Sequence, residues 1–267
     1  MQVRISHRTT YRYREPVKYT AQTLRLTPRR DGEQHTLAWS IHAPGRRAEQ
    51  MDAHDNITHL LTLEEPHTEI SIVVTGIVEI TRTRDVLREQ NTLSPLAYLA
   101  PTVLTAPSDR IVALARDHLE GPGPLRRRLY DLANGVCASV RYQPGTTTVE
   151  DPAAAALERG EGVCQDQAHV LIACCRSMGI PARYVSGYLC SGHAGETASH
   201  AWVEAWLSEA QGWHGIDVTH VEPAGAGHCR LAVGRDYLDA APVRGMRRGG
   251  GPEVMDVSVT ATSVDAQ

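Results

Sequence analysis

Phenylalanine is absent from this chain of 267 residues, so tyrosine, tryptophan, leucine and valine must supply the bulk of any core. No apolar run approaches the roughly 18 residues that a membrane-spanning helix needs, which predicts that the protein has no membrane partner. Residues 1–16 alternate polar and apolar side chains and lack the continuous apolar stretch of a signal peptide.

A strong excess of charge of either sign is also missing. The formal net charge is −4 and the isoelectric point is near 6.3. The arginine clusters at 29–30, 126–128 and 247–248 are short and scattered along the chain. Without a concentrated basic region, there is no electrostatic basis for binding nucleic acid.

The six cysteines show no CxxC spacing, which excludes the common zinc-binding and redox motifs. In a chain of this size without a secretion signal, they are expected to be reduced thiols. The sequence therefore predicts a cytoplasmic protein.

Hydrophobic periodicity divides the chain into two structural regions joined by a connector. Residues 1–84 alternate with period two, as at Val3, Ile5 and His7, and predict an all-β, sandwich-like N-terminal domain. Prolines punctuate a connector at 85–107. Residues 108–267 show helical spacing and then further strand patterns, which predict helices packed on an antiparallel sheet. The predicted fold class is α+β.

One helix within the second region carries three of the six cysteines. It is expected to begin near Gly162, to bury one apolar face and to end at Gly179-Ile180-Pro181. Cys164 falls in its first turn, where unpaired backbone amides and the helix dipole favour a thiolate. The same amides can bind an oxyanion formed by attack on a carbonyl.

Free cysteines are more commonly small buried apolar residues than nucleophiles. That interpretation is applied to Cys174 and Cys175, in the middle of the helix, and to Cys137, which follows an apolar residue on another helix. For Cys164 the position alone does not decide between the two interpretations, because a nucleophilic thiol also needs a base.

The strand-like segments after this helix supply a candidate base and a carboxylate. His200 begins "SHAWVEAWL", with Ala201, Val203 and Ala205 expected on the core face and His200 and Trp202 on the opposite, cleft-lining face. Asp217 ends "GWHGID". A simple hairpin places His200 opposite residue 219 or 220, so a shift of two or three residues is needed to bring it opposite Asp217.

Three segments together resemble the core of the bacterial transglutaminase-like superfamily, whose members are often described as cysteine proteases. They are "GVCQDQAHVLIACCRSMGIPARYVSGYL", "ASHAWVEAWL" and "GWHGIDVTH". The N-terminal segments "YRYREPV", "LRLTPR" and "HDNITHLLTL" resemble the region that accompanies this core, and the tail "VGRDYLDAAPVRGMRRGGG" also fits.

The resemblance implies that Cys164 is the nucleophile, His200 the general base and acid, and Asp217 the carboxylate that orients it. Tyr142 falls where such proteins carry an aromatic residue near the active site. Tyr142, Gln165 and Trp202 are candidates for the oxyanion side or the pocket rather than members of the triad. Asp166 and His169 are expected to make structural hydrogen bonds.

The expected function is acyl transfer through a thioester on a peptide, protein or carboxamide substrate, with hydrolysis favoured over cross-linking. A protein-glutamine transglutaminase and a non-catalytic peptide-binding module remain alternatives. A metal site drawn from His193, His200, His214 or His228 lacks the CxxC or HExxH spacing, so no metal and no cofactor is expected. The sequence indicates neither the substrate's identity nor the oligomeric state.

Overall fold

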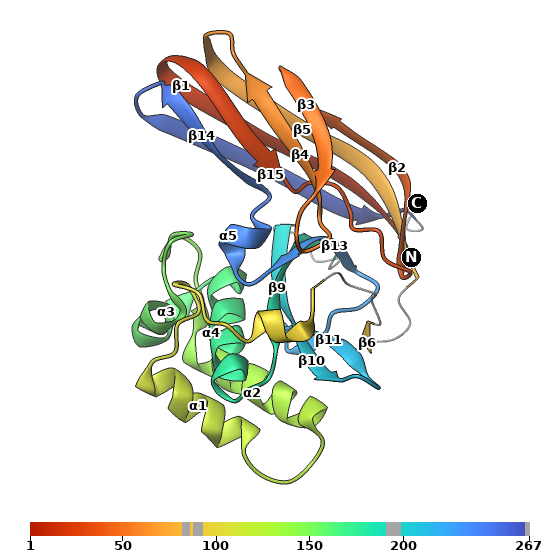
Figure 1. Ribbon diagram of the computed structural model, residues 1–267, viewed down its shortest axis with the longest axis vertical. Coiled ribbons are helices and arrows are strands. Elements are labelled where there is room, and N and C mark those ends of the chain that lie inside the picture. The colour runs from red at the N-terminus through yellow and green to blue at the C-terminus, as the bar shows by residue number, and fades with distance from the viewer. Residues whose placement is uncertain (82–85, 88–92, 191–198, 265–267) are drawn as a thin grey trace.

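A β-rich lobe and a mixed helix-and-sheet lobe make up the computed structural model (Figure 1), which describes residues 1–81, 86–87, 93–190 and 199–264. The upper lobe contains strands only, whereas the lower lobe packs helices against a second sheet. This arrangement confirms the predicted α+β fold class.

The upper lobe is one seven-stranded antiparallel sheet that is organised around the first strand. The strand order is β2-β5-β1-β4-β3, and β14 and β15 also pair with β1. Val3, Ile5 and His7 are buried, as their alternation predicts. The strands are β1 (Gln2–Leu24), β2 (Gln34–His42), β3 (Arg46–Met51), β4 (Ile57–Leu63), β5 (His67–Ile80), β14 (Val243–Gly249) and β15 (Glu253–Ser263).

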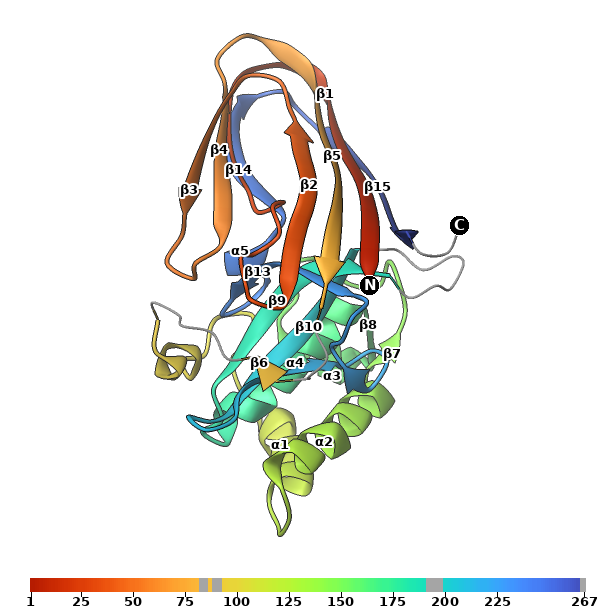
Figure 2. The ribbon, with the colours of Figure 1, turned by 90° about the vertical axis from the view of Figure 1, so that its right-hand side faces the viewer.

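Strand β1 changes its pairing partners half-way along its length. Its first half pairs with β5 and β15, and its second half pairs with β4 and β14. The pairing with β5 shifts register between Arg12 and Val17, a stretch that contains Pro16, which cannot donate a backbone hydrogen bond. Residues from both halves share one apolar core, including Leu61 and Ile72. The two halves face each other as in a sandwich (Figure 2).

The last two strands lie in the upper lobe, which differs from the expectation that residues 108–267 form a single second region. β14 pairs with the second half of β1, and β15 pairs with the first half. The sequence of β15 alternates apolar and polar residues from Val257 to Ala261, and such alternation does not specify which sheet a strand joins. The boundaries near residues 84 and 107 stay predictions.

The lower lobe packs its helices on a sheet of strand order β12-β11-β10-β9-β13, with β6 also paired to β11. A short parallel pair, β7 and β8, precedes helix α4. The helices are η1 (Pro95–Tyr98), α1 (Asp109–Leu119), α2 (Leu125–Ser139), α3 (Ala153–Arg159), α4 (Cys164–Ser177) and α5 (Tyr237–Ala240). The strands are β6 (Val86–Leu87), β7 (Arg141–Tyr142), β8 (Glu161–Gly162), β9 (Ala182–Leu189), β10 (Ser199–Ser208), β11 (Gly212–Asp217), β12 (Glu222–Pro223) and β13 (His228–Gly234).

Helix α4 is buried on all sides rather than on one face. Every residue from 165 to 176 is buried, because α4 lies between the other helices and strands β9 and β10. Cys174 and Cys175 are fully enclosed, as predicted, and Cys137 is half-buried on α2.

The central sheet of the lower lobe is also covered on both faces. On β10, Ala201, Val203 and Ala205 pack against the helices as expected. Glu204, on the opposite face, is not in an open cleft but is fully buried. Its carboxylate binds the guanidinium groups of Arg183 and Arg230, and Arg230 also binds Asp31 of the upper lobe at 2.6 Å. Paired charges of this kind tolerate burial.

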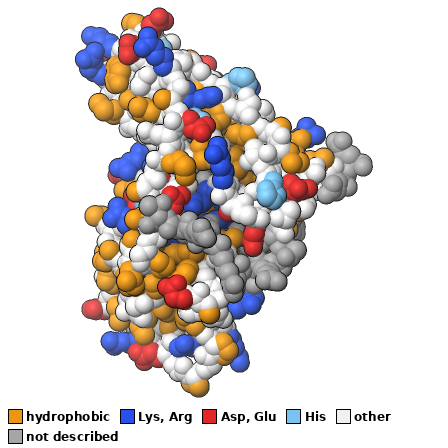
Figure 3. Space-filling view, turned by 45° about the vertical axis from the view of Figure 1, so that its right-hand side comes forward, with side chains coloured by type: hydrophobic (Ala, Val, Ile, Leu, Met, Phe, Trp, Pro, Cys, Tyr) orange, Lys and Arg blue, Asp and Glu red, His pale blue; other side chains and the backbone are white. Residues whose placement is uncertain are grey.

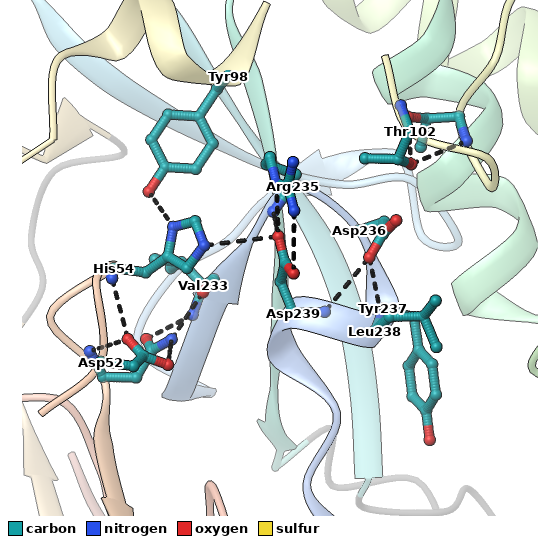
Figure 4. Close-up of polar contacts among 12 residues, drawn as sticks. Asp52, His54, Tyr98, Thr102, Val233, Arg235, Asp236, Tyr237, Leu238 and Asp239 are labelled. Atoms are coloured by element: carbon teal, nitrogen blue, oxygen red, sulfur yellow. Dashed lines mark hydrogen bonds and ion pairs between the residues drawn. The ribbon is translucent and has the colours of Figure 1, made fainter. Parts of the chain in front are cut away.

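A second polar cluster fixes the two lobes against each other (Figure 4). Asn56 of the upper lobe exchanges two 2.8 Å hydrogen bonds with the backbone of Val233 on β13. His54 lies 2.9 Å from the hydroxyl of Tyr98 on η1 and 3.5 Å from the carboxylate of Asp239 on α5. Because these contacts join the two lobes and η1, the lobes hold one relative orientation.

The surface carries charges of both signs, and Figure 3 shows acidic and basic side chains interspersed on one face of the molecule. Among the described residues, no helix combines the length and the apolar character needed to cross a bilayer.

Candidate active site

Cys164 is the first residue of α4, and the chain enters the helix from an extended residue, Val163. The carboxylate of Asp166 accepts hydrogen bonds from the Val163 amide at 2.7 Å and from the Thr147 hydroxyl at 2.8 Å. A β-carbon at Gly162 would lie 2.7 Å from the Asp166 side chain, so glycine is required there. Asp166 thus holds the turn that presents the thiol. The Asp166 amide donates to the Val163 carbonyl at 2.9 Å, so the first-turn amides without a carbonyl partner in the helix are those of Cys164 and Gln165.

Two other predicted site residues lie near this turn. Tyr142 pairs with Gly162 across β7 and β8, and the Gln143 amide donates to the Gly162 carbonyl at 2.7 Å. Gln165 is buried, and its side-chain amide donates to the Val149 carbonyl at 3.4 Å. Tyr142 is 44% exposed, so it is not a core aromatic. The parts of both residues in binding an oxyanion or a substrate stay predictions.

His200 lies between the thiol and a carboxylate. Its Nε2 atom is 2.8 Å from Oδ2 of Asp217, and its ring lies close enough to the Cys164 thiol to interact with it. With Nε2 bonded to Asp217, Nδ1 is the nitrogen available to the thiol. Burial lowers the pKa of His200, but the bonds to Asp217 and Cys164 outweigh it and raise the pKa to about 10.

The expected register shift between the strands that carry His200 and Asp217 is wrong. Strands β10 and β11 pair Trp206 with Trp213 and Val203 with Ile216, which is the simple hairpin register. The only irregularity in this pairing lies beyond Trp206, at the turn. Continuing this register would place Trp202 opposite Asp217, so His200 reaches Asp217 diagonally, a distance that two side chains can span.

Asp217 ends β11 and is fully buried, with both carboxylate oxygens occupied. Oδ1 accepts the backbone amides of Thr219 at 3.1 Å and His220 at 3.3 Å. Oδ2 contacts three imidazoles, those of His200 and His220 at 2.8 Å and that of His228 at 3.0 Å. Burial alone would raise the pKa of Asp217, but these imidazole bonds bring it well below the usual range.

His220 and His228 are the contacts of Asp217 that the sequence analysis missed. The Gly225 amide donates to Nδ1 of His228 at 3.1 Å, which leaves the proton on Nε2, where it is donated to Asp217. Burial lowers the pKa of His228, despite the opposing effect of Asp217, so this imidazole is neutral. His220 follows Asp217 by three residues, a spacing typical of a turn, but nothing in the sequence indicates that β13 brings His228 here.

Trp202 encloses this group of imidazoles. It is fully buried, with its ring stacked near that of His200 at 6.3 Å and edge-on to that of His228 at 5.1 Å between centroids. Its indole Nε1 is buried and has no hydrogen-bond partner among the described residues. The indole therefore shields the His200–Asp217 pair from water, and its part in binding substrate stays a prediction.

Comparison with known proteins places this geometry in a family. Residues 112–218 match the transglutaminase-like superfamily, and residues 3–79 match the bacterial transglutaminase-like N-terminal region. An uncharacterised protein of Mycobacterium leprae is 32% identical, with 97% of this chain and 98% of that protein covered. The chain belongs to the transglutaminase-like superfamily.

Other members of the superfamily extend the likeness over the whole chain. An uncharacterised protein of Mycobacterium tuberculosis is 30% identical over 96% of this chain and 91% of its own. A crystal structure from Cytophaga hutchinsonii, described as a candidate cysteine protease, superposes with a TM-score of 0.81 at 24% identity. It covers 100% of this chain and 92% of its own, so both lobes share one fold.

The cluster of imidazoles around Asp217 could also be a metal site instead of a hydrogen-bonded group. Ligand atoms of His200, Asp217 and His228 lie within 4.8 Å of one another. A metal on Nε2 of His228 would require its proton to move to Nδ1, where it would oppose the amide hydrogen of Gly225. The imidazoles are therefore better suited to donate hydrogen bonds to Asp217 than to bind a metal with it.

The other histidines considered for a metal do not join this cluster. His214 is buried elsewhere, with Nε2 3.1 Å from the Tyr130 hydroxyl, and burial lowers its pKa to about 4. His193 lies outside the described residues.

The superfamily fold supports cysteine-dependent acyl transfer in general. The described site offers a thiol at a helix start, an imidazole that interacts with it, and a carboxylate that fixes this imidazole. Such a set can transfer a proton from thiol to imidazole and return it to a leaving group.

Proposed function

We propose that this protein catalyses acyl transfer through a thioester on Cys164, with peptides or carboxamides as substrates and water as the usual acceptor. The observation that carries the proposal is the position of His200. Its ring interacts with the Cys164 thiol and hydrogen-bonds to the buried carboxylate of Asp217. A merely structural histidine would not need a thiol partner at a helix start.

In the proposed reaction, the Cys164 thiolate attacks the carbonyl carbon, and the first-turn amides of α4 stabilise the oxyanion. Protonated His200 then gives its proton to the leaving nitrogen as the C–N bond breaks, which leaves a thioester and a free amine. Neutral His200 next takes a proton from water, and the resulting hydroxide attacks the thioester. Release of the carboxylic acid restores the thiolate and the imidazolium, while Asp217 keeps His200 oriented throughout.

Hydrolysis is favoured over cross-linking because water needs no dedicated binding site, whereas an amine must outcompete water for the thioester. The Cytophaga protein with the same fold is described as a candidate cysteine protease, in agreement with this preference. All six cysteines are free thiols, which supports a cytoplasmic location.

The test compares two half-buried cysteines of the same chain, Cys164 and Cys137. Turnover of a mixed panel of fluorogenic peptide amides is measured for wild type, Cys164→Ala and Cys137→Ala. Wild type and Cys137→Ala are expected to hydrolyse the same members of the panel, and Cys164→Ala none. Full activity in Cys164→Ala would end the proposal.

The acceptor is determined with a glutamine-containing peptide, in the presence and absence of a primary alkylamine. Hydrolysis of the side-chain amide converts glutamine to glutamate, whereas transfer attaches the amine, and mass spectrometry separates the two products. A predominance of the amine adduct at low amine concentration would identify a transglutaminase and overturn the preference for water.

A further inference from the structure

A cavity of about 300 Å³ adjoins the proposed catalytic residues on the side of Asp217. Two of its wall residues, His220 and His228, bond to Oδ2 of Asp217. Resting on the function proposed above, we propose that this cavity binds a cationic alkyl side chain in the leaving group of the substrate. Glu222 is the counter-ion of this cationic side chain. The substrates are then peptides with a lysine-like residue after the scissile bond.

The position of the cavity selects the leaving-group side of the substrate. His200 must reach the leaving nitrogen in order to protonate it, so the leaving group lies on the side of His200. The ring of His220, in the cavity wall, is 5.5 Å from the ring of His200 between centroids. The cavity therefore begins beside the imidazole that protonates the leaving nitrogen.

The chemistry of the cavity selects a cation on an apolar stem. Leu189, Pro223 and Ala226 provide apolar wall surface suited to methylene groups. Among the wall residues that the structure describes, the one carboxylate belongs to the exposed Glu222, and none of the described residues forms an ion pair with it. An acidic oxygen of Glu222 also lies within 4.8 Å of one of Asp217. Because Asp217 is already paired with the imidazolium of His200, the negative charge left for a cation is that of Glu222.

The walls are held in place before any ligand binds. Glu222 is paired with Asp217 across β11 and β12, and the Ala224 amide donates to the Gly215 carbonyl at 3.1 Å. The Cys190 amide donates to the Gly227 carbonyl at 2.9 Å. Because the backbone of the cavity is fixed by these bonds, little ordering is needed on binding.

The experiment measures binding without turnover, on the Cys164→Ala variant. The probes are Nα-acetyl-lysine amide and Nα-acetyl-norleucine amide, which differ in the charged amino group of the side chain, and calorimetry gives each Kd. The lysine probe is expected to bind about fivefold more tightly, the effect of one partly solvated ion pair. The preference is expected to vanish in Glu222→Gln and to shrink as sodium chloride is raised.

Glu209→Gln is the matched control, because Glu209 is an exposed glutamate at the opposite end of the β10–β11 hairpin. It is expected to keep the full preference for the lysine probe. Equal binding of the two probes, no saturable binding of the lysine probe, or a preference that survives Glu222→Gln would each overturn the cation site. Since no step of this assay uses the thiol, the outcome is independent of whether Cys164 proves to be a nucleophile.

Discussion

The start and the middle of helix α4 place the same side chain in two opposite environments. At the start, Cys164 is half-buried, follows an extended residue and interacts with His200. In the middle, Cys174 and Cys175 are fully enclosed by apolar neighbours. Burial raises the pKa of the Cys175 thiol to about 12 and that of Cys174 beyond the usual range of thiols.

The difference between Cys164 and the two mid-helix cysteines shows that the position of a cysteine in the fold sets the chemistry of its thiol. Cys174 donates its proton towards the Ile111 carbonyl at 3.5 Å, a contact that only a neutral thiol can make. Cys164 instead faces a base and the unpaired amides of the first helical turn. One helix therefore contributes packing through two of its thiols and, under the proposed function, chemistry through the third.

The largest expected effect is the difference in alkylation rate between the two positions. At pH 7 a thiol with a pKa of about 12 is ionised in only about one molecule in 10⁵. Iodoacetamide is therefore expected to modify Cys164 at least about 10³-fold faster than Cys174 or Cys175. Peptide mass spectrometry gives each rate, and unfolding in urea should abolish the difference. Equal rates in the folded protein would contradict this account.

The second effect comes from the carboxylate behind His200. Asp217→Asn removes the charge that holds the imidazolium and is expected to lower turnover by about 10²-fold or more. Alkylation of Cys164 near pH 6.5 should fall towards the rate of Cys137, the half-buried thiol of α2. Asp239→Asn is the control, because Asp239 also pairs with a histidine, His54, but at the junction of the lobes. A normal rate in Asp217→Asn would show that His200 needs no orienting carboxylate.

Local patterns in the sequence predicted the start of α4 and the strand that carries His200. Period-two alternation gave β1 and β10, while glycine and proline marked the end of α4, because these signals act over a few residues. Tertiary contacts decided the rest. The all-round burial of α4 and the placement of β14 and β15 beside β1 depend on segments far away in the sequence.

The candidate site divides in the same way. The thiol, the imidazole and the carboxylate lie in recognisable local motifs, but the register that joins them was predicted wrongly, because a diagonal contact was not considered. His228 reaches Asp217 from β13, which pairs with β9 and not with β11. No spacing rule anticipates a contact between such strands.

A third and smaller effect is expected from His228. His228→Leu leaves Oδ2 of Asp217 without one of its donors, and is expected to slow turnover and Cys164 alkylation about tenfold. His228→Gln keeps an N–H in that place and should restore much of both rates. The mid-helix cysteines should react as in wild type, which separates loosening of the site from general unfolding. His214→Gln controls for loss of a buried histidine, and an equal slowing there would refute the positioning role of His228.

The smallest effect is a difference in pH dependence between the two parts of α4. The pKa of His200 is raised to about 10, so its contribution to stability is complete below its unfolded pKa of about 6.5 and is lost as pH rises through 10. The pKa of Cys175 is also raised, but from a thiol's ordinary value, so its contribution is lost only above about pH 9. Between pH 7 and 8 the free energy of unfolding should therefore fall by about 1 kcal/mol in wild type and in Cys175→Ala. Urea titrations at the two pH values measure it. The free energy of unfolding of His200→Gln should not fall between pH 7 and 8. An equal fall in this variant would show that groups other than His200 titrate in this range, which would contradict the prediction.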